Sequence, residues 1–256
     1  MVVSPDVPET SPETTQGIEY EIAATREERE AAFRLVYASY LRGGLGAMNA
    51  WRMRVTPYHL LPTTQVFVAK HRGEVIFTAS LVADGELGLP MECVYGEAVA
   101  ERRGRGMWLA EVSCLADRRA HLRGFLPVFL RISRLLVQYA VGQGMDALVL
   151  AVHPKHARFY RRYMQFEVMS PQTQYPTVRN RPAVALWLDF SRFEQELRTH
   201  QNFDTFFGDE LPREVLQPQP ISAAECDYFR PMIDPSFRLA PLDEGELFSR
   251  GAAHVA

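Results

Sequence analysis

The sequence of 256 residues predicts a mixed α/β protein, with one sheet of parallel and antiparallel strands, covering helices and a helical C-terminal extension. Two alternating apolar segments, 64–69 and 74–81, flank His71-Arg72-Gly73 and predict an antiparallel hairpin. A continuous apolar run over 147–152 lies between two helical patterns and predicts a central buried strand. Hydrophobic residues make up 47% of the chain, enough for one sizeable core plus an appendage.

The first elements precede the hairpin. Residues 1–17 are rich in Pro, Ser, Thr and Glu and lack apolar periodicity, so we expect a disordered tail. Residues 18–22 alternate as a strand does. Thr25-Arg26-Glu27-Glu28 is a capping box, and the helix that it begins ends at Gly43-Gly44.

The later elements complete a domain that we place at 18–190. In chain order they are a polar helix or loop at 95–106, a strand at 107–115, a helix at 124–141, the central strand, a helix at 155–163, and strands near 166–169 and 183–188. Residues 191–256 carry several prolines and no strand pattern. Because Ser222-Ala223-Ala224-Glu225 is a second capping box, we expect a loosely packed helical or irregular extension there.

Charge is distributed unevenly along the chain. The net charge is −3, yet residues 118–162 contain nine arginines or lysines and a single acid, Asp146, so this segment carries +8 and the rest −11. A cationic surface of this kind attracts an anionic partner or a phosphate, and a solvated helix face is the alternative interpretation.

Cysteine content and hydropathy predict the compartment. The three cysteines lie far apart without a Cys-x-x-Cys pair, and no signal peptide is evident, which favours a reducing, cytoplasmic setting. The longest apolar run, near 124–141, contains Arg131 and Arg134. It is too short and too charged to span a bilayer, so we expect no transmembrane segment.

The strand at 107–115 contains a carboxylate. Alternation places Glu111, Ser113 and Leu115 on one face and Cys114 on the other, which argues against Cys114 as a nucleophile activated by Glu111 and favours a small core residue. Burial raises the pKa of an unpaired carboxyl group, and a raised pKa suits a general base. The alternative for Glu111 is a structural salt bridge to an arginine near 101–105.

Two histidines and two tyrosines follow the central strand. His153 lies at its carboxyl end, where α/β sheets bind ligands, although a hydrogen bond to the turn is the simpler role. His156 brings no third ligand at a suitable spacing, so we expect no metal. A phenol can protonate a leaving thiolate, which makes Tyr160 a candidate acid; Tyr160 and Tyr163 alternatively pack in the core.

These residues carry a resemblance to a known family. Glu111-Val112-Ser113, the central strand and 153–166 resemble the catalytic core of the FeeM-type N-acyl amino acid synthases, a branch of the GNAT acyltransferase superfamily related to acyl-homoserine lactone synthases. The resemblance covers about 18–190 and includes Phe33-Arg34-Leu35-Val36-Tyr37, Leu61-Pro62-Thr63-Thr64, Gly88-Leu89-Pro90-Met91-Glu92 and Pro182-Ala183-Val184-Ala185-Leu186. It implies a GNAT fold followed by the C-terminal extension.

The resemblance also implies a reaction and its partners. A medium- or long-chain fatty acyl group would pass from a thioester on acyl carrier protein to the amine of an amino acid. Glu111 would accept the amine proton, the strand amides near Ser113, Cys114 and Leu115 would orient the thioester carbonyl, and Tyr160 would protonate the pantetheine sulfur. The phosphopantetheine phosphate would meet Arg118, Arg119 and Arg123, and the carrier protein would dock on Lys155, Arg158, Arg161 and Arg162. His153 completes the candidate site. We expect neither a tightly bound cofactor nor a nucleic-acid partner.

Three departures from related patterns bear on the donor and the acceptor. Acetyl-CoA enzymes of the superfamily carry a glycine-rich loop around the pyrophosphate, whereas 119–125 has one glycine, which weakens the case for CoA. Cys114 stands where homoserine lactone synthases have arginine, and Gln165 replaces a glycine common before Phe166. The alternatives are an acyl-CoA-dependent GNAT N-acyltransferase acting on another amine, and a non-catalytic GNAT module that binds an acyl or carrier-protein ligand.

Overall fold

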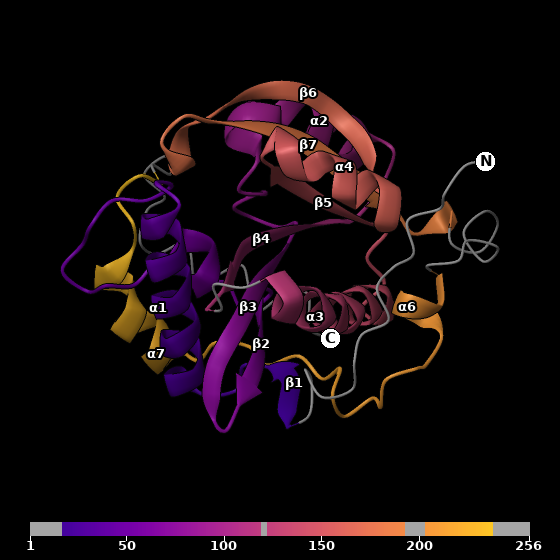
Figure 1. The fold of residues 1–256 in the computed structure, drawn as a ribbon. Coiled ribbons are helices and arrows are strands. Elements are labelled where there is room, and N and C mark those ends of the chain that lie inside the picture. Colours follow the sequence, from indigo (N-terminus) through magenta and orange to yellow (C-terminus); the bar gives the residue numbers. More distant parts are fainter. Residues whose placement is uncertain (1–16, 119–121, 193–202, 238–256) are drawn as a thin grey trace.

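The computed structural model describes residues 17–118, 122–192 and 203–237 (Figure 1). In this part of the chain one sheet of seven strands has the order β1-β2-β3-β4-β5-β7-β6. Strands β4 and β5 are parallel, and the other neighbours are antiparallel. The strands are β1 (Ile18–Ile22), β2 (Gln65–His71), β3 (Glu74–Ala83), β4 (Leu109–Asp117), β5 (Ala147–Val152), β6 (Glu167–Tyr175) and β7 (Arg181–Asp189). The mixed α/β prediction is confirmed.

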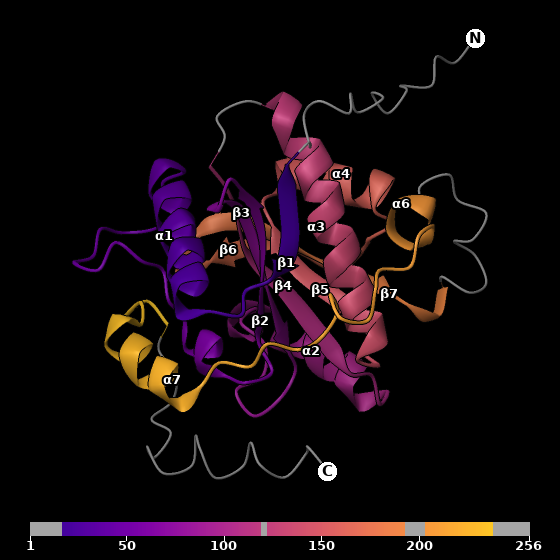
Figure 2. The same cartoon turned by 90° about the horizontal axis from the view of Figure 1, so that it is seen from below.

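Helices cover both faces of the sheet (Figures 1 and 2). On one face lie α3 (Leu122–Gly142) and α4 (Pro154–Tyr163), whose apolar side chains join one core cluster with β2–β5 and β7. On the other face lie α1 (Arg26–Arg42) and α2 (Glu92–Gly104), each over a cluster of its own. Strands β2 to β5 are therefore largely buried on both faces, as their long apolar runs require, whereas the edge strand β6 is mostly exposed.

Local chemistry sets the element boundaries. The Thr25 hydroxyl accepts from the Glu28 amide while the Glu28 carboxylate accepts from the Thr25 amide, so the predicted capping box begins α1. Arg72 and Gly73 both have positive φ, 52° and 78°, which is the backbone of a tight turn whose twist suits a hairpin. The hairpin of β2 and β3 closes there, as predicted.

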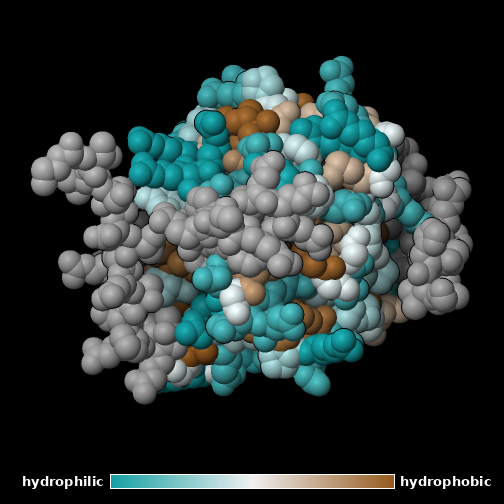
Figure 3. All heavy atoms as spheres, turned by 90° about the vertical axis from the view of Figure 1, so that its right-hand side faces the viewer, coloured by the Kyte–Doolittle hydropathy of each residue, from teal (hydrophilic) through white to brown (hydrophobic). Residues whose placement is uncertain are grey.

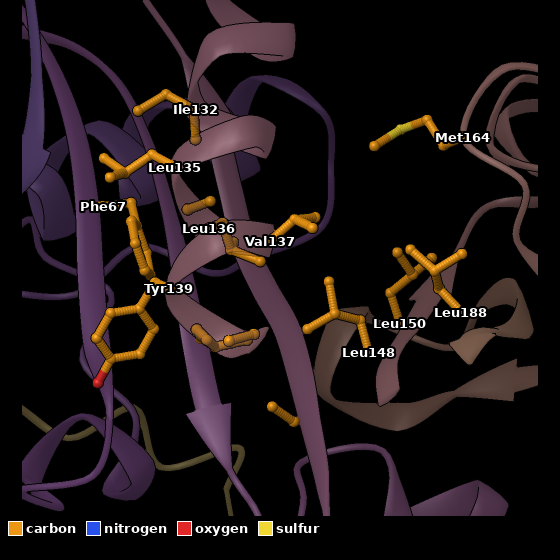
Figure 4. Packing of buried hydrophobic residues seen from close by; sticks show 14 of the residues in the cluster. Phe67, Ile132, Leu135, Leu136, Val137, Tyr139, Leu148, Leu150, Met164 and Leu188 are labelled. Carbon is orange, nitrogen blue, oxygen red and sulfur yellow. The ribbon is translucent and has the colours of Figure 1, made fainter. Parts of the chain in front are cut away.

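Helix α3 is the one described helix long and apolar enough to cross a membrane. Val128, Phe129, Ile132 and Leu135 are buried, and Figure 4 shows this side of α3 packed toward the sheet. The side of the molecule in Figure 3 displays mainly hydrophilic described residues, with apolar ones in small separate groups. Packing in the core accounts for the apolar stripe of α3, which favours a core helix.

The C-terminal extension crosses the molecule from α3 to α1 (Figure 2). Its helix α6 (Phe203–Phe207) lies beside α3, where the Gln138 side chain donates to the carbonyls of Phe206 and Asp209. Its helix α7 (Ala223–Phe229) begins at the predicted Ser222 cap and packs on α1 with the 3-10 turn η5 (Arg230–Met232). Phe229 is fully buried, so the expectation of loose packing is wrong for this segment. The predicted tail lies outside the described residues except for Gly17.

Candidate active site

The sheet splits between its two parallel strands. Strand β4 pairs with β5 only over Leu109–Glu111, opposite Ala147–Val149. Beyond Glu111 the two strands run on without pairing, β4 to Asp117 and β5 to Val152. Because parallel strands open toward their carboxyl ends here, Glu111 lies at the base of the split, where ligands of α/β sheets bind.

A β-bulge interrupts β4 just above this point. Ser113 is paired with Ser80 and Ala116 with Thr78, so three steps along β4 match two along β3. Cys114 has a φ of 52°, a left-handed conformation that residues other than glycine adopt rarely. Cys114 and Leu115 thus fall between paired positions.

The bulge corrects the predicted faces of β4. Val112 and Leu115 both pack in the α3 and α4 cluster, whereas Cys114 packs in the cluster under α1. Cys114 therefore shares the face of Glu111, and Leu115 does not, because the extra residue reverses the alternation. Burial raises the pKa of the Cys114 thiol, so it remains the small core residue that was predicted.

Glu111 is buried without an ion-pair partner among the described residues. Glu111 is only 3% exposed, and its Oε2 accepts a hydrogen bond from the Met91 amide at 2.7 Å. Burial raises its pKa to about 8; the hydrogen bond from Met91 opposes the shift, and the nearby Glu92 charge adds to it. A carboxyl group that titrates near neutrality can both accept and release a proton.

The alternative of a structural salt bridge to Glu111 is overturned. Arg102 lies over the Trp187 ring and 3.9 Å from Glu101. Arg103 pairs with Asp84 and Glu92, and Arg105 pairs with Glu101. All three arginines lie at the carboxyl end of α2 and face acids other than Glu111.

Aromatic side chains surround Glu111, and the sequence analysis missed them. Tyr58 comes from the 3-10 turn η2 (Pro57–Leu60), and Tyr175 from the end of β6. Burial raises both phenol pKa values, and the Glu111 charge raises them further. Cys93, an exposed free cysteine in the first turn of α2, hydrogen-bonds with Tyr175. These groups come from three distant segments, which no local pattern connects.

Tyr40 and Arg54 are two further residues that the pattern did not identify. The Arg54 guanidinium lies over the Tyr40 ring, 4.9 Å from its centroid. Burial raises the Tyr40 pKa, and the Cys114, Glu111 and Tyr160 groups contribute to the same shift. Tyr40 therefore lies within electrostatic reach of both faces of the split.

Tyr160 lies on the opposite side from Glu111, in α4. Its ring contacts Phe129, Phe159 and Phe166 at centroid distances of 6.1, 5.7 and 5.7 Å. Its hydroxyl makes no hydrogen bond to the described residues, and burial raises its pKa. The phenol stays protonated at neutral pH and is free to donate.

A narrow apolar cavity of about 30 Å³ adjoins Tyr160. Figure 4 shows side chains of α3 on one side of this region and those of β5, with Met164, on the other. The lining residues are Ala79, Val112, Leu115, Phe129, Ile132, Ser133, Leu136, Val137, Leu148, Leu150, Tyr160, Met164 and Phe166. Ser133 and Tyr160 supply the polar groups, so the lining of this small cavity is almost wholly apolar.

His153 begins α4. Its Nδ1 accepts from the Lys155 amide at 3.3 Å, and the residue is exposed. The simpler of the two predicted roles, a hydrogen bond to the turn, is thus present. Among the described residues, no group of three or more His, Cys, Asp or Glu side chains could hold a metal ion.

The predicted cationic residues divide into two sets. Lys155, Arg158, Arg161 and Arg162 are exposed on α4 and form no ion pair with the described residues; together we call them the α4 cationic surface. Arg118 pairs with Glu74 at the end of β4. Arg119 lies outside the described residues, as does the side chain of Arg123, so this structure does not place the predicted phosphate contacts.

Comparison with known proteins identifies the relatives of this site. A family model described as N-acyl amino acid synthase FeeM matches residues 31–189, and none of the curated proteins matches. The solved structure of FeeM, an N-acyl amino acid synthase from uncultured soil microbes, is 26% identical, covers 71% of this chain and 95% of its own, and has a TM-score of 0.62.

Two acyl-homoserine lactone synthases share the fold at 14% identity. BjaI, a CoA-dependent synthase solved with SAM and isopentyl-CoA, covers 83% of this chain and 99% of its own with a TM-score of 0.54. LasI covers 76% of this chain and 96% of its own with a TM-score of 0.52. The expected GNAT acyltransferase fold is confirmed. Because the family model spans more than half of the sequence, this chain is an N-acyltransferase that belongs to the FeeM family of N-acyl amino acid synthases.

Proposed function

We propose that this N-acyltransferase moves a medium- or long-chain acyl group from an acyl carrier protein thioester to the α-amine of an amino acid. The observation that carries the proposal is the buried, unpaired Glu111 at the base of the split between β4 and β5. We also propose a cytoplasmic location, which the three free thiols support.

Glu111 acts as the base in the proposed reaction. The amine nitrogen attacks the thioester carbonyl carbon, and its surplus proton passes to Glu111 directly or through one water molecule. A carboxyl group whose pKa is raised to about 8 is a stronger base than an ordinary glutamate and holds the proton from the attacking nitrogen more readily. The raised pKa supports Glu111 in this role.

The bulge in β4 and Tyr160 handle the other half of the reaction. The amides near Ser113, Cys114 and Leu115 orient the carbonyl oxygen, since Cys114 and Leu115 fall between paired positions of the strand. When the carbon–sulfur bond breaks, Tyr160 donates its proton to the departing thiolate. Exchange with solvent then returns a proton to Tyr160 and removes one from Glu111 before the next turnover.

The cavity beside Tyr160 supports the choice of an apolar acyl chain. Its lining is almost wholly hydrocarbon, and a chain that enters it is removed from water. At about 30 Å³ the cavity holds only a small part of such a chain, so the side chains of α3 must separate from those of β5 as the chain enters.

The α4 cationic surface supports acyl carrier protein, and not CoA, as the group that carries the acyl thioester. Lys155, Arg158, Arg161 and Arg162 leave this helix with four charges that no described acid neutralises. An acidic protein is attracted by such a surface, and the attraction weakens with salt. The CoA-dependent relatives with this fold make acyl-CoA the competing donor.

A donor and acceptor assay tests the proposal. The protein is incubated with amino acids and with medium- or long-chain acyl thioesters of either acyl carrier protein or CoA. The products are identified by mass spectrometry. We expect N-acyl amino acids from the carrier-protein thioester. Products from CoA thioesters alone, or products with simple amines alone, would overturn the proposal in favour of the acyl-CoA-dependent alternative; no product from any donor would favour the non-catalytic module.

A charge-reversal pair tests the docking surface. The double variant Lys155→Glu, Arg158→Glu should raise KM for the acyl carrier protein thioester by about tenfold without changing KM for acyl-pantetheine. Arg213→Glu is the matched control, because Arg213 is an exposed cation on the C-terminal extension. An equal loss in both variants would contradict docking on α4.

A further inference from the structure

Two buried arginines anchor the C-terminal extension, and their surroundings differ. Arg29 of α1 is 3% exposed; its guanidinium donates to Glu225 at 2.6 Å and to the Gln219 carbonyl at 2.8 Å, and also reaches the Ala24 carbonyl. Both of its terminal nitrogen atoms have hydrogen-bond partners. Arg29 is a structural anchor between α1 and α7.

Arg54 is 4% exposed and has one donor without a partner. One terminal nitrogen donates to Asp234, which follows η5, and the other donates to the Thr177 carbonyl at 2.9 Å. Among the described residues, the buried Nε has no hydrogen-bond partner. A buried guanidinium nitrogen left unpaired costs free energy, so this donor calls for an acceptor that the described part of the chain does not supply.

Arg54 also spans the split in the sheet. Thr177 belongs to the turn between β6 and β7, on the β5 side of the split, whereas the Cys114 thiol, which Arg54 contacts, belongs to β4. The guanidinium contacts the rings of Tyr40 and Phe237, at 4.9 and 5.2 Å from their centroids. It therefore lies on the same face of β4 as Glu111.

We propose that Arg54 recognises the carboxylate of the acceptor amino acid, and that Asp234 is a positioning residue that fixes the guanidinium before the acceptor arrives. This inference rests on the proposed function. The terminal nitrogens already donate to Asp234 and Thr177, and the unpartnered Nε supplies a charged donor for a carboxylate oxygen. The acceptor then lies with its amine toward Glu111 and its carboxylate toward Arg54.

The spacing along β4 agrees with this placement. Cys114, which Arg54 contacts, is three positions from Glu111, or about 10 Å of extended strand at most and less across a bulge. One amino acid, together with one water molecule between its amine and Glu111, spans about this distance when each hydrogen bond is about 2.8 Å long. The C-terminal extension thus contributes to acceptor selection through Asp234.

Paired acceptors test the role of Arg54. We compare L-tyrosine with tyramine and L-phenylalanine with phenethylamine, because each pair differs by one carboxylate. The variant Arg54→Gln should lower kcat/KM for the amino acids by about 10- to 100-fold and for the amines by less than about threefold, so the preference for the amino acid collapses. Arg29→Gln, the matched buried arginine on the same extension, should leave that preference unchanged.

Asp234→Asn tests the positioning role separately. It should raise KM for the amino acid several-fold and leave kcat and the KM for tyramine unchanged. The reason is that the guanidinium keeps its charge but loses its fixed orientation. If Arg54→Gln or Asp234→Asn changes amino acid and amine equally, the inference is wrong.

A binding measurement covers the case in which Arg54→Gln does not fold. Cys93 is the exposed thiol of the three cysteines, and its pKa responds to the Glu111 charge. L-tyrosine should slow iodoacetamide alkylation of Cys93 in the unmodified protein more than tyramine does, and Arg54→Lys should reduce that difference. Equal protection by both compounds would overturn carboxylate recognition. Absence of any acylated product would instead count against the proposed function.

Discussion

The two faces of β4 carry different chemistry at neighbouring positions. On the side of α3 and α4, Val112, Leu115 and Tyr160 line an apolar cavity. On the side of α1 and α2, Glu111 lies among Tyr58, Tyr175 and the segment that carries Arg54. One strand thus separates a hydrocarbon compartment from an ionisable one.

Burial has opposite consequences on these two faces. It raises the pKa of Glu111 to about 8, which brings a carboxyl group into the range where it gains and loses a proton at neutral pH. It also raises the pKa of Tyr160, which keeps a phenol protonated. The same desolvation prepares a base on the acceptor face and preserves an acid on the acyl face.

Loss of the base is expected to have the largest effect. Glu111→Gln should lower kcat by about 10²- to 10⁴-fold, because the amide cannot accept the amine proton. Glu92→Gln is the control, since the Glu92 carboxylate adds to the shift of the Glu111 pKa and pairs with Arg103. It should change kcat by less than about fivefold. Steady-state kinetics with both variants checks the assignment, and equal losses would contradict it.

The same substitution should stabilise the protein at alkaline pH. The folded pKa of Glu111, about 8, lies above its unfolded value, so the protonated form favours folding and that contribution is lost as pH rises from about 4.5 to 8. Glutamine stays neutral. Urea unfolding of Glu111→Gln should therefore give a free energy of unfolding about 3 to 5 kcal/mol above that of the unmodified protein at pH 9, and a similar value at pH 4.5. If the difference in the free energy of unfolding between the two proteins does not change with pH, the raised pKa of Glu111 is contradicted.

Loss of the acid on the acyl face is expected to cost less. Tyr160→Phe should lower kcat by about 10- to 100-fold for a pantetheine thioester, because water can partly replace the phenol as proton donor. The control is Tyr163→Phe, one turn further along α4. With a thioester whose thiol leaves without protonation, Tyr160→Phe should lose less kcat. If the loss of kcat is the same for both leaving groups, Tyr160 has a packing role instead.

The smallest effect concerns the turn that supports the acyl face. Gln165 has a φ of 60°, the left-handed conformation that explains why glycine is common at this position. Gln165→Gly should raise the free energy of unfolding by about 0.5 kcal/mol, since relief of the backbone exceeds the entropy cost of glycine. Gln143→Gly, at a position without positive φ, should lower it. Denaturant midpoints at constant slope measure both.

Periodicity and capping signals predicted most of the elements, because each of these signals is local. The central strand lies at 147–152 as predicted, and both capping boxes begin helices. The bulge at Cys114 was missed because the sequence places no glycine at the left-handed residue, and this reversed the predicted faces of Cys114 and Leu115. Glu111 and Tyr160 could be proposed from the chain itself, with their roles supplied by the resemblance.

The residues around Glu111 could not be predicted in the same way. Arg54 comes from a loop, Tyr58 from a short 3-10 turn and Tyr175 from the last position of β6, where periodicity constrains the direction of a side chain least. Asp234 reaches Arg54 from 180 residues away, and its position depends on the path of the whole extension. Such contacts are set by tertiary packing.

The pH dependence of kcat/KM tests most directly the claim that Glu111 is the base on the acceptor face. The rate is measured from pH 6 to 9.5 (a range on both sides of the Glu111 pKa of about 8) and expressed per unprotonated amine, so that titration of the acceptor is removed. The unmodified protein should lose activity as pH falls through about 8, approaching tenfold per pH unit, whereas Glu111→Gln should give a low and nearly flat profile. The same fall with pH in Glu111→Gln would contradict the account.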